Sequence, residues 1–524
     1  MSSITNKRWT LHVENLAKID HADVEVSRLM CFVGNNNSGK SYLMSLLWGI
    51  MMYGRDHFPS KPSESKVYRK CEAWIQQNWG KNCVAEGDIV NLYCDWFNEI
   101  LANNKQALVR KIFNRELVVG KIEIRNVAKS RRISIRWKGD ASRFSNGGGY
   151  VQFPATDRFE KTAAARVNAY ICWNLLMEGI AGPALTPSLR SRRLGEPLYL
   201  PASRTGFMLT YKQLLSGALE YYSFFQVPDD EMESMQLTAP YVDFLQAITQ
   251  FDTSKKVPDK YKEIISFAES EMTGGSIIAK GENLPTVMYR PEGIKDDLPL
   301  YATSSIVSEL SPLLLVLKSD IKFKTIIIEE PEAHLHPALQ KKMAQFIIRL
   351  MNSGINVWIT THSDTVLQHI NNMIRLQKHP DKKELMKQFG YIDEDLLDIG
   401  NVNLYQFDAV TQNKTELNGV EHNEYGFIVP TFNDALDAML EEVYTLRDNN
   451  DEYEKLVLGV ADPTNLAGRK PMLGGGWKEN EWDKNRIAIR IPKGREEHLT
   501  HKGIKMTKER IGAFDVLCGE LSLA

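Results

Sequence analysis

A glycine-rich segment near the N-terminus has the residue types and the spacing that hold a nucleotide phosphate. It matches the pattern G-x-x-x-x-G-K-[ST] without a mismatch. The glycines let successive backbone N–H groups face a phosphate, Lys40 reaches the β- and γ-phosphates and assists catalysis, and the Ser41 hydroxyl is a hard ligand for Mg²⁺. An apolar strand before the segment and an apolar helix after it argue against a chance turn. We therefore predict that ATP binds to Gly34, Asn35, Asn36, Asn37, Ser38, Gly39, Lys40, Ser41 and Tyr42.

A second segment places carboxylates at the end of an apolar strand. Residues 325–328 are Thr-Ile-Ile-Ile, and Glu329, Glu330 and Glu332 follow them. Carboxylates this close repel one another unless a cation lies between them, and ligands of a parallel sheet bind where its strands end. We predict that Glu329 binds Mg²⁺, directly or through water, and that Glu330 polarises the attacking water. The alternative is a solvated turn that caps the next helix.

The acidic segment also resembles a known family. Residues 326–337 read Ile-Ile-Ile-Glu-Glu-Pro-Glu-Ala-His-Leu-His-Pro, similar to the Walker B and D-loop segment of ABC-type ATPases, most of all the overcoming-lysogenization-defect (OLD) proteins and related prokaryotic defence ATPases. The resemblance implies that His334 and His336 lie in a D-loop at a dimer seam rather than forming a metal pair. It also implies that His362, after a buried strand, is a switch histidine that hydrogen-bonds the γ-phosphate and helps to hold Glu330.

A third segment, residues 304–312, precedes an apolar helix. Because proline suits only the first turn of a helix, Pro312 predicts that this helix starts near residue 312. Ser304 and Ser305 would then lie beside free helix N–H groups, which bind anions. The segment resembles the degenerate signature of OLD-like ATPases, which closes over the ATP of the partner in ABC dimers, although it lacks the usual glycine and carries Ile306. We predict that Ser304 and Ser305 contact nucleotide; the alternative is an ordinary capped helix.

Residues 201–206 follow a short strand and resemble the Q-loop region of these ATPases, but they contain no glutamine. Two interpretations of Arg204 remain open. It either helps to sense the nucleotide or pairs with a surface carboxylate.

Strands that alternate with helices must position these residues. Short strands lead into the apolar run 29–33, and strand–helix units follow at 325–351 and 356–376, which indicates a mostly parallel sheet covered on both faces. The predicted fold class is α/β, an ABC-type P-loop ATPase head with a mixed, mostly parallel sheet and large helical insertions. The predicted domains are the first part of the head (1–60), an α+β insertion (61–195), a return strand (196–205), a helical insertion (206–282), the second part of the head (283–447) and a basic extension (448–524).

The bulk composition excludes several classes of protein. The 524 residues are 43% hydrophobic and 25% charged with a net charge of −2, so the chain is globular and has no general basic character. Six cysteines without a Cys-x-x-Cys pair indicate reduced thiols rather than a disulfide scaffold. Without a signal peptide's apolar core or an apolar stretch long enough to span a bilayer, we expect a cytoplasmic protein that does not bind membranes.

Other features exclude related functions. Sustained heptads are missing, so the long coiled-coil arms of SMC-type ATPases are not expected, and a transporter's Leu-Ser-Gly-Gly-Gln signature is missing as well. A nuclease domain of the Toprim type needs Asp-x-Asp at the end of a strand. Asp393-Glu394-Asp395 instead stands in a polar, helical segment, which predicts a solvated face.

Two functions fit the motifs. The first is the ATP-hydrolysing sensor of a prokaryotic anti-phage defence system, a homodimer or higher homo-oligomer that controls a separate effector protein; PARIS-type AriA and Septu-type ATPases fit it by resemblance. The second is a repair or processing ATPase of RecF-like or SMC-like action. It would bind double-stranded DNA through Arg132, Arg136 and Lys138, through 190–193, or through the basic segment 468–510, although each patch is also typical of a solvated face. A small-molecule kinase is a poor fit to the Glu-Glu-Pro and Thr-Thr-His segments.

Overall fold

A computed structural model describes most of the chain. The described residues are 8–138, 144–154, 158–182, 195–224, 237–281, 284–319, 321–411, 413–423, 426–429 and 442, and five short strands beyond them. These residues divide into two compact units, 1–428 and 429–524. The basic segment 468–510 lies largely outside the described residues, as does 190–193, so the predictions that rest on these two patches stay predictions.

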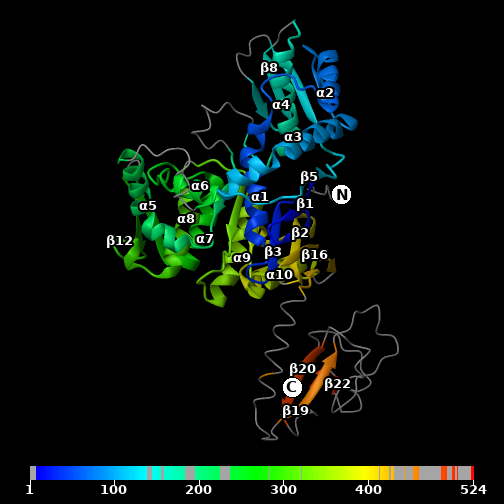
Figure 1. The fold of residues 1–524 in the computed structure, drawn as a ribbon. Helices are drawn as coiled ribbons and strands as arrows, with labels where there is room; N and C mark the ends of the chain where they lie inside the picture. Colours follow the sequence, from blue (N-terminus) through cyan, green and yellow to red (C-terminus); the bar gives the residue numbers. More distant parts are fainter. Residues whose placement is uncertain are drawn as a thin grey trace. The chain divides into compact units, whose positions relative to one another are not determined.

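One nine-stranded sheet forms the centre of the first unit (Figure 1). Five of its eight neighbouring strand pairs are parallel and three are antiparallel, so the predicted α/β class with a mixed, mostly parallel sheet is confirmed. Its strands, in spatial order, are β5 (Lys121–Arg125), β1 (Thr10–Leu16), β2 (Ile19–Glu25), β16 (Lys414–Gly419), β15 (Val402–Thr411), β3 (Leu29–Gly34), β14 (Asn356–Thr360), β13 (Thr325–Glu329) and β9 (Leu198–Leu200).

The central strands are buried along their whole length. Every residue of β3, β13 and β14 is buried, as expected for parallel strands that are covered on both faces. The helices that follow these strands are α1 (Lys40–Tyr53), α9 (Pro337–Asn352) and α10 (Asp364–Lys378). Between α10 and β15 lie α11 (Lys382–Phe389) and two short 3₁₀ turns, η6 (Asp393–Asp395) and η7 (Ile399–Asn401).

The first insertion shares its core with the head. After a short 3₁₀ turn, η1 (Gly54–His57), three helices pack around a small four-stranded sheet, and their buried side chains form one hydrophobic cluster with those of β1, β2 and α1. The approach of α1 to α3 depends on Gly49, where a Cβ atom would lie 2.1 Å from Ile112 Cδ1. The elements are α2 (Lys66–Gln77), β4 (Cys83–Ala85), α3 (Asp88–Phe113), β6 (Ile133–Lys138), β7 (Ser145–Gly147), β8 (Tyr150–Pro154) and α4 (Lys161–Met177).

The second insertion is mainly helical and adds a small antiparallel sheet. It forms the green region of Figure 1 together with α8 (Ser305–Lys318). Its elements are α5 (Arg204–Phe224), α6 (Ala239–Ile248), α7 (Asp259–Ala268), the π-helical turn η4 (Glu269–Thr273), β10 (Gly275–Lys280), β11 (Thr286–Pro291), β12 (Leu298–Pro299) and the 3₁₀ turn η5 (Leu300–Ala302).

The remaining strands are short. In the first unit β17 (His422–Asn423) pairs with β18 (Gly426–Phe427). In the second unit β19 (Tyr453–Gly459) pairs with β20 (Arg486–Pro492), and β21 (Leu499–His501) lies between β22 (Ile504–Lys505) and β23 (Leu521–Leu523). No helix in the described part of the chain combines the length and the apolar composition that crossing a bilayer requires.

Two local predictions are wrong. The signature-like helix α8 begins at Ser305, not near Pro312, and Pro312 lies inside it. The helix tolerates proline because the Ser311 hydroxyl donates to the Ser308 carbonyl at 2.9 Å, replacing the N–H that proline lacks. The predicted solvated face at 393–395 is wrong for Asp395, which is fully buried and accepts from Arg349 with both oxygens, at 2.6 and 3.0 Å, whereas Asp393 and Glu394 are exposed as predicted.

The cysteine prediction agrees with the structure where it can be compared. Cys31, Cys71, Cys94 and Cys172 are buried free thiols, and Cys83 is a half-buried free thiol. Cys518 lies outside the described residues.

Candidate functional site

The phosphate-binding loop connects β3 to α1. Gly34, at the end of β3, has φ 139°, and a Cβ atom there would lie 2.8 Å from the Phe407 carbonyl oxygen of β15. A side chain at this position would therefore clash with the neighbouring strand as well as strain the backbone. Asn35, Asn36, Asn37 and Ser41 are exposed, whereas Ser38 is buried. The loop thus presents its polar groups and the N-terminal end of α1 to solvent, where an anion is stabilised.

Lys40 is folded back over its own loop. Its ammonium group donates to the carbonyls of Gly34 and Asn35 at 2.9 and 2.8 Å, and the side chain is only 6% exposed. Burial lowers the pKa of Lys40 to about 8, although Glu330, Glu329 and Glu332 raise it. The structure thus brings the lysine of the loop into the electrostatic field of the acidic strand end.

Glu329 ends β13 with one oxygen bound and one free. Its Oε2 accepts from the backbone N–H of Ala202 at 3.2 Å and from the hydroxyl of Tyr241 at 3.1 Å. Its Oε1 is buried, and within the described residues it accepts no hydrogen bond. A buried carboxylate oxygen without a donor fits a hydrated Mg²⁺ ion, to which the exposed Ser41 hydroxyl would be the other hard ligand.

Glu330 turns away from the strand toward the histidine. Its backbone lies in the left-handed region (φ 44°) and its N–H donates to the Thr360 carbonyl at 2.9 Å, so the adjacent strand β14 holds the turn. This conformation is strained for a residue other than glycine, and such strain gathers at functional sites. His362 Nε2 lies 3.8 Å from Glu330 Oε1, and both side chains are partly exposed.

The backbone of His362 is anchored by Glu332. The Glu332 carboxylate accepts from the His362 N–H at 2.6 Å and from the Thr361 hydroxyl at 2.8 Å. Burial raises the pKa of Glu332. For His362, burial and then Lys40 lower the pKa while Glu330 raises it, so the ring is neutral near pH 7 and can both donate and accept.

Arg204 pairs with a buried carboxylate rather than a surface one, and its predicted role in sensing the nucleotide stays a prediction. Its guanidinium is buried and donates to the carbonyls of Glu329 at 2.5 Å and Glu330 at 3.0 Å. Its Nε also lies 2.9 Å from Glu309 Oε2, and Glu309 is buried in α8. The partner is therefore a buried carboxylate, and Arg204 joins the acidic strand end to the signature-like helix.

Ser304 and Ser305 stand at the exposed N-terminal end of α8. Ser304 is the N-cap residue, and its side chain makes no capping hydrogen bond. Among the described residues, no hydrogen bond joins either serine to the loop 34–41, and α8 packs mainly on α5, α7 and β10. Within one chain the structure thus brings together Lys40, Glu329, Glu330 and His362 but not the two serines.

Other candidate residues have structural contacts. The half-buried Tyr42 ring lies against Phe113, with ring centroids 5.2 Å apart, so it faces the first insertion. His336 Nδ1 accepts from the Ala338 N–H and caps α9, whereas His334 Nε2 lies 3.8 Å from Glu309 Oε1. These contacts do not join the two histidines into a metal pair.

Sequence reasoning missed three contributors: Tyr241, Glu309 and Glu332 as an anchor. Tyr241 comes from the second insertion, 88 positions before Glu329 in the chain, and no local pattern signals that contact. The sequence shows Glu332 as a third carboxylate, but its partners, Thr361 and His362, follow another strand, β14.

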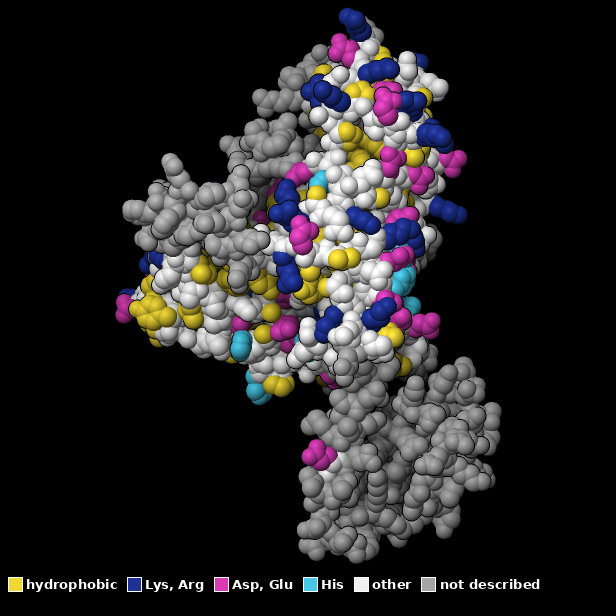
Figure 2. Space-filling view, viewed as in Figure 1, with side chains coloured by type: hydrophobic (Ala, Val, Ile, Leu, Met, Phe, Trp, Pro, Cys, Tyr) yellow, Lys and Arg dark blue, Asp and Glu magenta, His cyan; other side chains and the backbone are white. Residues whose placement is uncertain are grey.

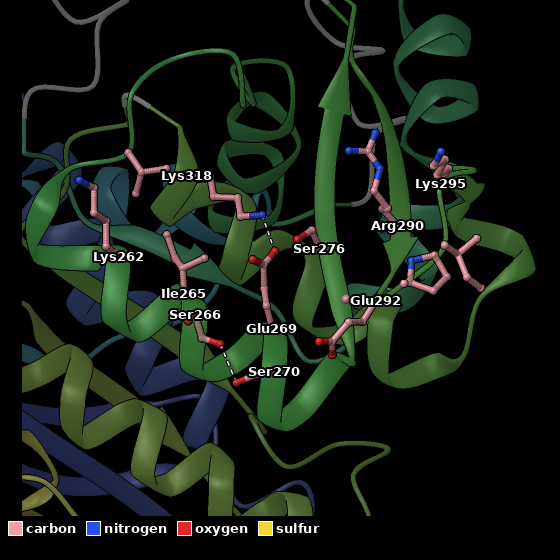
Figure 3. Close-up of a pocket in the computed structure, with 15 residues that line it drawn as sticks. Lys262, Ile265, Ser266, Glu269, Ser270, Ser276, Arg290, Glu292, Lys295 and Lys318 are labelled. Carbon is pink, nitrogen blue, oxygen red and sulfur yellow. Dashed lines mark hydrogen bonds and ion pairs between the residues drawn. The ribbon is translucent and has the colours of Figure 1, made fainter.

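A separate cavity of about 960 Å³ opens in the second insertion (Figure 3), and none of its lining residues is a nucleotide-binding candidate. Lys318, in the last turn of α8, crosses it to Glu269 at 2.5 Å, and Ser270 donates to the Ser266 carbonyl. The lining mixes Lys262, Lys295 and Arg290 with Glu292, so it has no single sign of charge.

Part of the chain is similar to a known protein family. Residues 191–368 match a family model described as "AAA domain, putative AbiEii toxin, Type IV TA system". A search of curated proteins found no match.

Similar solved structures are heads of SMC proteins. They include an SMC head bound to the C-winged helix domain of ScpA (11% identity, covering 79% of this chain and 97% of that chain, TM-score 0.31). The SMC head domain from Thermotoga maritima has 11% identity, covers 79% and 99%, and has a TM-score of 0.28. An Smc head domain bound to the C-terminal domain of ScpA, derived from Pyrococcus furiosus, has 12% identity, covers 84% and 100%, and has a TM-score of 0.30. TM-scores of this size do not identify a shared function.

The segment 191–368, which matches the AAA family model, contains the acidic strand β13, Arg204, helix α8 and His362. The phosphate loop lies outside this segment, at the end of β3. With these parts joined in one sheet, the chain carries a P-loop ATPase head.

Proposed function

We propose that this protein binds and hydrolyses Mg-ATP and uses the cycle as a switch. One observation carries the proposal: three buried neighbouring strands, β3, β14 and β13, deliver Lys40, His362, Glu329 and Glu330 to one edge of the sheet. Lys40 binds the phosphates, Glu329 and Ser41 hold Mg²⁺, and the ion neutralises charge on the phosphates when it is bound. Glu330 accepts the proton of the attacking water, while His362 donates to the phosphoryl oxygens.

The second half of each site would come from another copy of the chain. The exposed start of α8 offers free N–H groups and two serine side chains that make no hydrogen bond within the described part of the chain, and such groups suit a phosphate. Because these groups do not reach the loop of their own chain, we propose that ATP is held between two heads. The half-buried Ile306, where glycine is usual, leaves less room for close approach of backbone to ligand.

Arg204 would couple the acidic end of β13 to the signature-like helix α8 mechanically, because it contacts both. It holds the carbonyls of Glu329 and Glu330 and is paired with Glu309 on α8. A shift of the acidic strand end on nucleotide binding would therefore move a buried ion pair, which cannot stretch without a large cost. This connection suits a switch. Binding or loss of nucleotide would change the position of the exposed end of α8, which is the surface that a partner head would contact.

The biological role proposed for this switch is the sensor of a prokaryotic anti-phage defence system that controls a separate effector protein. Two facts support it: the motif resemblance to OLD-like defence ATPases, and the match of 191–368 to a family named for a type IV TA toxin.

A DNA-processing ATPase is the second candidate, on one observation. In β6 the apolar residues are buried while Arg136 and Lys138 are exposed, so this strand turns a basic face to solvent. The face of the molecule in Figure 2, however, mixes Lys and Arg with Asp and Glu over the described residues. Binding to plain duplex DNA that weakens steeply with salt would favour this candidate.

The decisive experiment is mass analysis of the native protein with Mg-ATP, comparing wild type with Glu330→Gln. Glu330→Gln keeps the size of the side chain but removes the base, so we expect bound ATP and a stable dimer or higher oligomer, with steady-state hydrolysis reduced at least about 100-fold. A copurifying effector would appear in the same spectra. Hydrolysis at the wild-type rate in Glu330→Gln would overturn the catalytic role of Glu330, and a monomer with ATP bound would overturn the shared site.

A further inference from the structure

Four polar side chains with metal-ligand chemistry share one face of the β1–β2 pair, apart from the nucleotide site. His12 lies opposite Asp23, and Glu14 lies opposite His21 in the antiparallel register. Residues two apart on a strand point to the same face, and opposite residues on neighbouring strands are close. The sequence signal is a His-x-Glu pair followed by a His-x-Asp pair on consecutive strands.

The four side chains contact one another directly. His12 Nδ1 lies 2.9 Å from Asp23 Oδ1, and His21 Nε2 lies 2.8 Å from Asp23 Oδ2. On its other side, His12 Nε2 lies 2.7 Å from Glu14 Oε1. The His12 side chain is 3% exposed, whereas those of His21 and Asp23 are 48% and 45% exposed. The cluster therefore has one buried member, His12, and three members that solvent can reach, since the Glu14 side chain is 42% exposed.

The contacts of His12 decide which of its nitrogens is available. A neutral imidazole carries one N–H, so it can donate to only one of two carboxylates. When Nε2–H donates to Glu14, the lone pair of Nδ1 faces the Asp23 carboxylate, and a cation between these atoms is favourable. A carboxylate that receives the second N–H of a ligating histidine is the usual arrangement in metal sites.

We propose that His12 Nδ1, His21 Nε2 and the Asp23 carboxylate bind one divalent first-row transition-metal ion, with Glu14 orienting His12. Two ligand atoms that bind one ion at right angles lie about 3.0 Å apart, given metal–ligand bonds of about 2.1 Å. The contacts of 2.8 and 2.9 Å, one to each carboxylate oxygen of Asp23, are close to this spacing, and one ligand atom from each residue lies within 4.8 Å of the others. Two histidines and a carboxylate on one side of an ion leave its solvent side open.

The positively charged side chains on the neighbouring strand do not neutralise this cluster in place of a metal ion. Lys121 and Arg125, on the adjoining strand β5, are both paired with Glu123, at 2.9 and 2.6 Å. The proposed ion would tie β1 to β2, and β2 begins at Ile19, whose side chain lies beside Gly39 of the phosphate loop. The site is independent of the proposed ATPase reaction.

Zinc is the probe for the test, on untagged full-length protein first treated with a chelator. We expect one Zn²⁺ per chain by isothermal titration calorimetry, a rise in Tm with Zn²⁺, and Co²⁺ absorption bands typical of nitrogen and oxygen ligands. His21→Ala and Asp23→Asn should each remove the binding and the Tm rise. Both positions are half-exposed, so these variants should fold. Glu14→Gln should weaken Zn²⁺ binding by about 10- to 100-fold.

His379→Ala is the matched control, because it removes an exposed histidine outside the cluster and should leave Zn²⁺ binding unchanged. Wild-type protein that binds no Zn²⁺ would overturn the proposal in favour of a cluster held by protons alone. Unchanged Zn²⁺ affinity in both His21→Ala and Asp23→Asn would overturn it as well. In each case ATP binding, measured in parallel, tests the nucleotide site separately.

Discussion

At the residue scale, the candidate nucleotide-binding residues differ in how firmly neighbouring groups hold them in place before a ligand binds. Lys40 is held by carbonyls of its own loop, Glu329 is bound through one oxygen, and Glu330 has a strained backbone fixed by β14. Positions held before a ligand arrives lower the cost of binding it. The ammonium of Lys40 must nonetheless exchange its carbonyl partners for phosphate oxygens.

We predict that ATP binding weakens as pH rises through about 8, where burial places the pKa of Lys40. Below this pH the free protein carries the ammonium; above it, binding must recover a proton, so Kd should rise by about tenfold per pH unit. The check is the affinity of the wild-type protein for a non-hydrolysable ATP analogue, measured over this range, because removing Glu330 would itself change the pKa of Lys40. His362→Asn should keep the same slope, because the pKa of His362 is lowered and this ring does not titrate there. A flat profile would contradict the prediction.

The same lowered pKa has a second consequence, for the stability of the free protein. The unfolded chain holds the Lys40 proton up to its ordinary pKa of 10.5, whereas the folded chain loses it from about 8. Between these values the unfolded state binds more protons, so this lysine makes folding more favourable as pH rises through that window.

Tyr241 is the residue-scale test of the Mg²⁺ assignment. Burial and the nearby Glu329 raise the pKa of Tyr241, so its hydroxyl stays protonated and donates to Glu329 Oε2. Tyr241→Phe removes only this donor, and we expect the Mg²⁺ concentration for half-maximal ATPase activity to rise by about 10-fold. Tyr261→Phe, in α7, is the control. If Tyr241→Phe and wild type require the same Mg²⁺ concentration for half-maximal activity, the assignment of Glu329 as a Mg²⁺ ligand is contradicted.

At the scale of elements, α8 shows why a local rule failed. Proline in a helix interior normally leaves a carbonyl unpaired, which is why the sequence predicted a helix start near Pro312. The neighbouring Ser311 hydroxyl supplies the missing donor to Ser308, and both serines are buried. As a result the helix begins a full seven residues earlier, at Ser305, and presents its free end at Ser304.

This compensation can be tested by a double-mutant cycle. Ser311→Ala leaves a buried carbonyl without a donor and should destabilise the protein by about 1–3 kcal/mol. Adding Pro312→Ala restores a backbone N–H at the position that normally bonds the Ser308 carbonyl, so the double variant should recover part of the loss. Thermal unfolding of the four proteins measures both effects. No loss of stability in Ser311→Ala would show that the hydroxyl contact contributes nothing, and equal losses in Ser311→Ala and the double variant would show that the restored N–H does not replace it.

The sequence predicted elements where the signal was local. The loop 34–41 and the strands β3, β13 and β14 follow from apolar runs and fixed spacing, and their positions agree with the prediction within a residue or two. The contacts of Arg204 and Asp395 could not be predicted in this way. Arg204 meets Glu330 across 126 positions and Asp395 meets Arg349 across 46, so only the folded sheet and helices bring them together.

At the scale of the whole molecule, the proposed site is complete only between copies. We therefore predict that two defective variants complement each other. Lys40→Ala keeps an intact α8 end but cannot bind ATP, whereas Ser304→Ala with Ser305→Arg keeps the loop and blocks the α8 end. A mixed dimer contains one site built from both intact halves, so an equal mixture should show roughly a quarter of wild-type hydrolysis.

Steady-state ATPase activity before and after mixing measures this complementation. Each variant alone should be inactive, and Lys40→Ala mixed with Glu330→Gln should stay inactive, because both lesions then lie on the same side of the site. Activity that is no greater in the mixture than in its separate components would contradict a shared site.

The contact between Gly34 and Phe407 has a consequence for how this protein is made. The phosphate loop is synthesised before the strand against which it closes, β15, which lies more than 360 residues later in the chain. Until that strand has left the ribosome, we expect the nascent chain not to bind nucleotide. Contacts this distant make folding slow. If the proposed function holds, nucleotide binding is therefore a late event in the biogenesis of this protein, and a chain truncated before residue 402 should not acquire it.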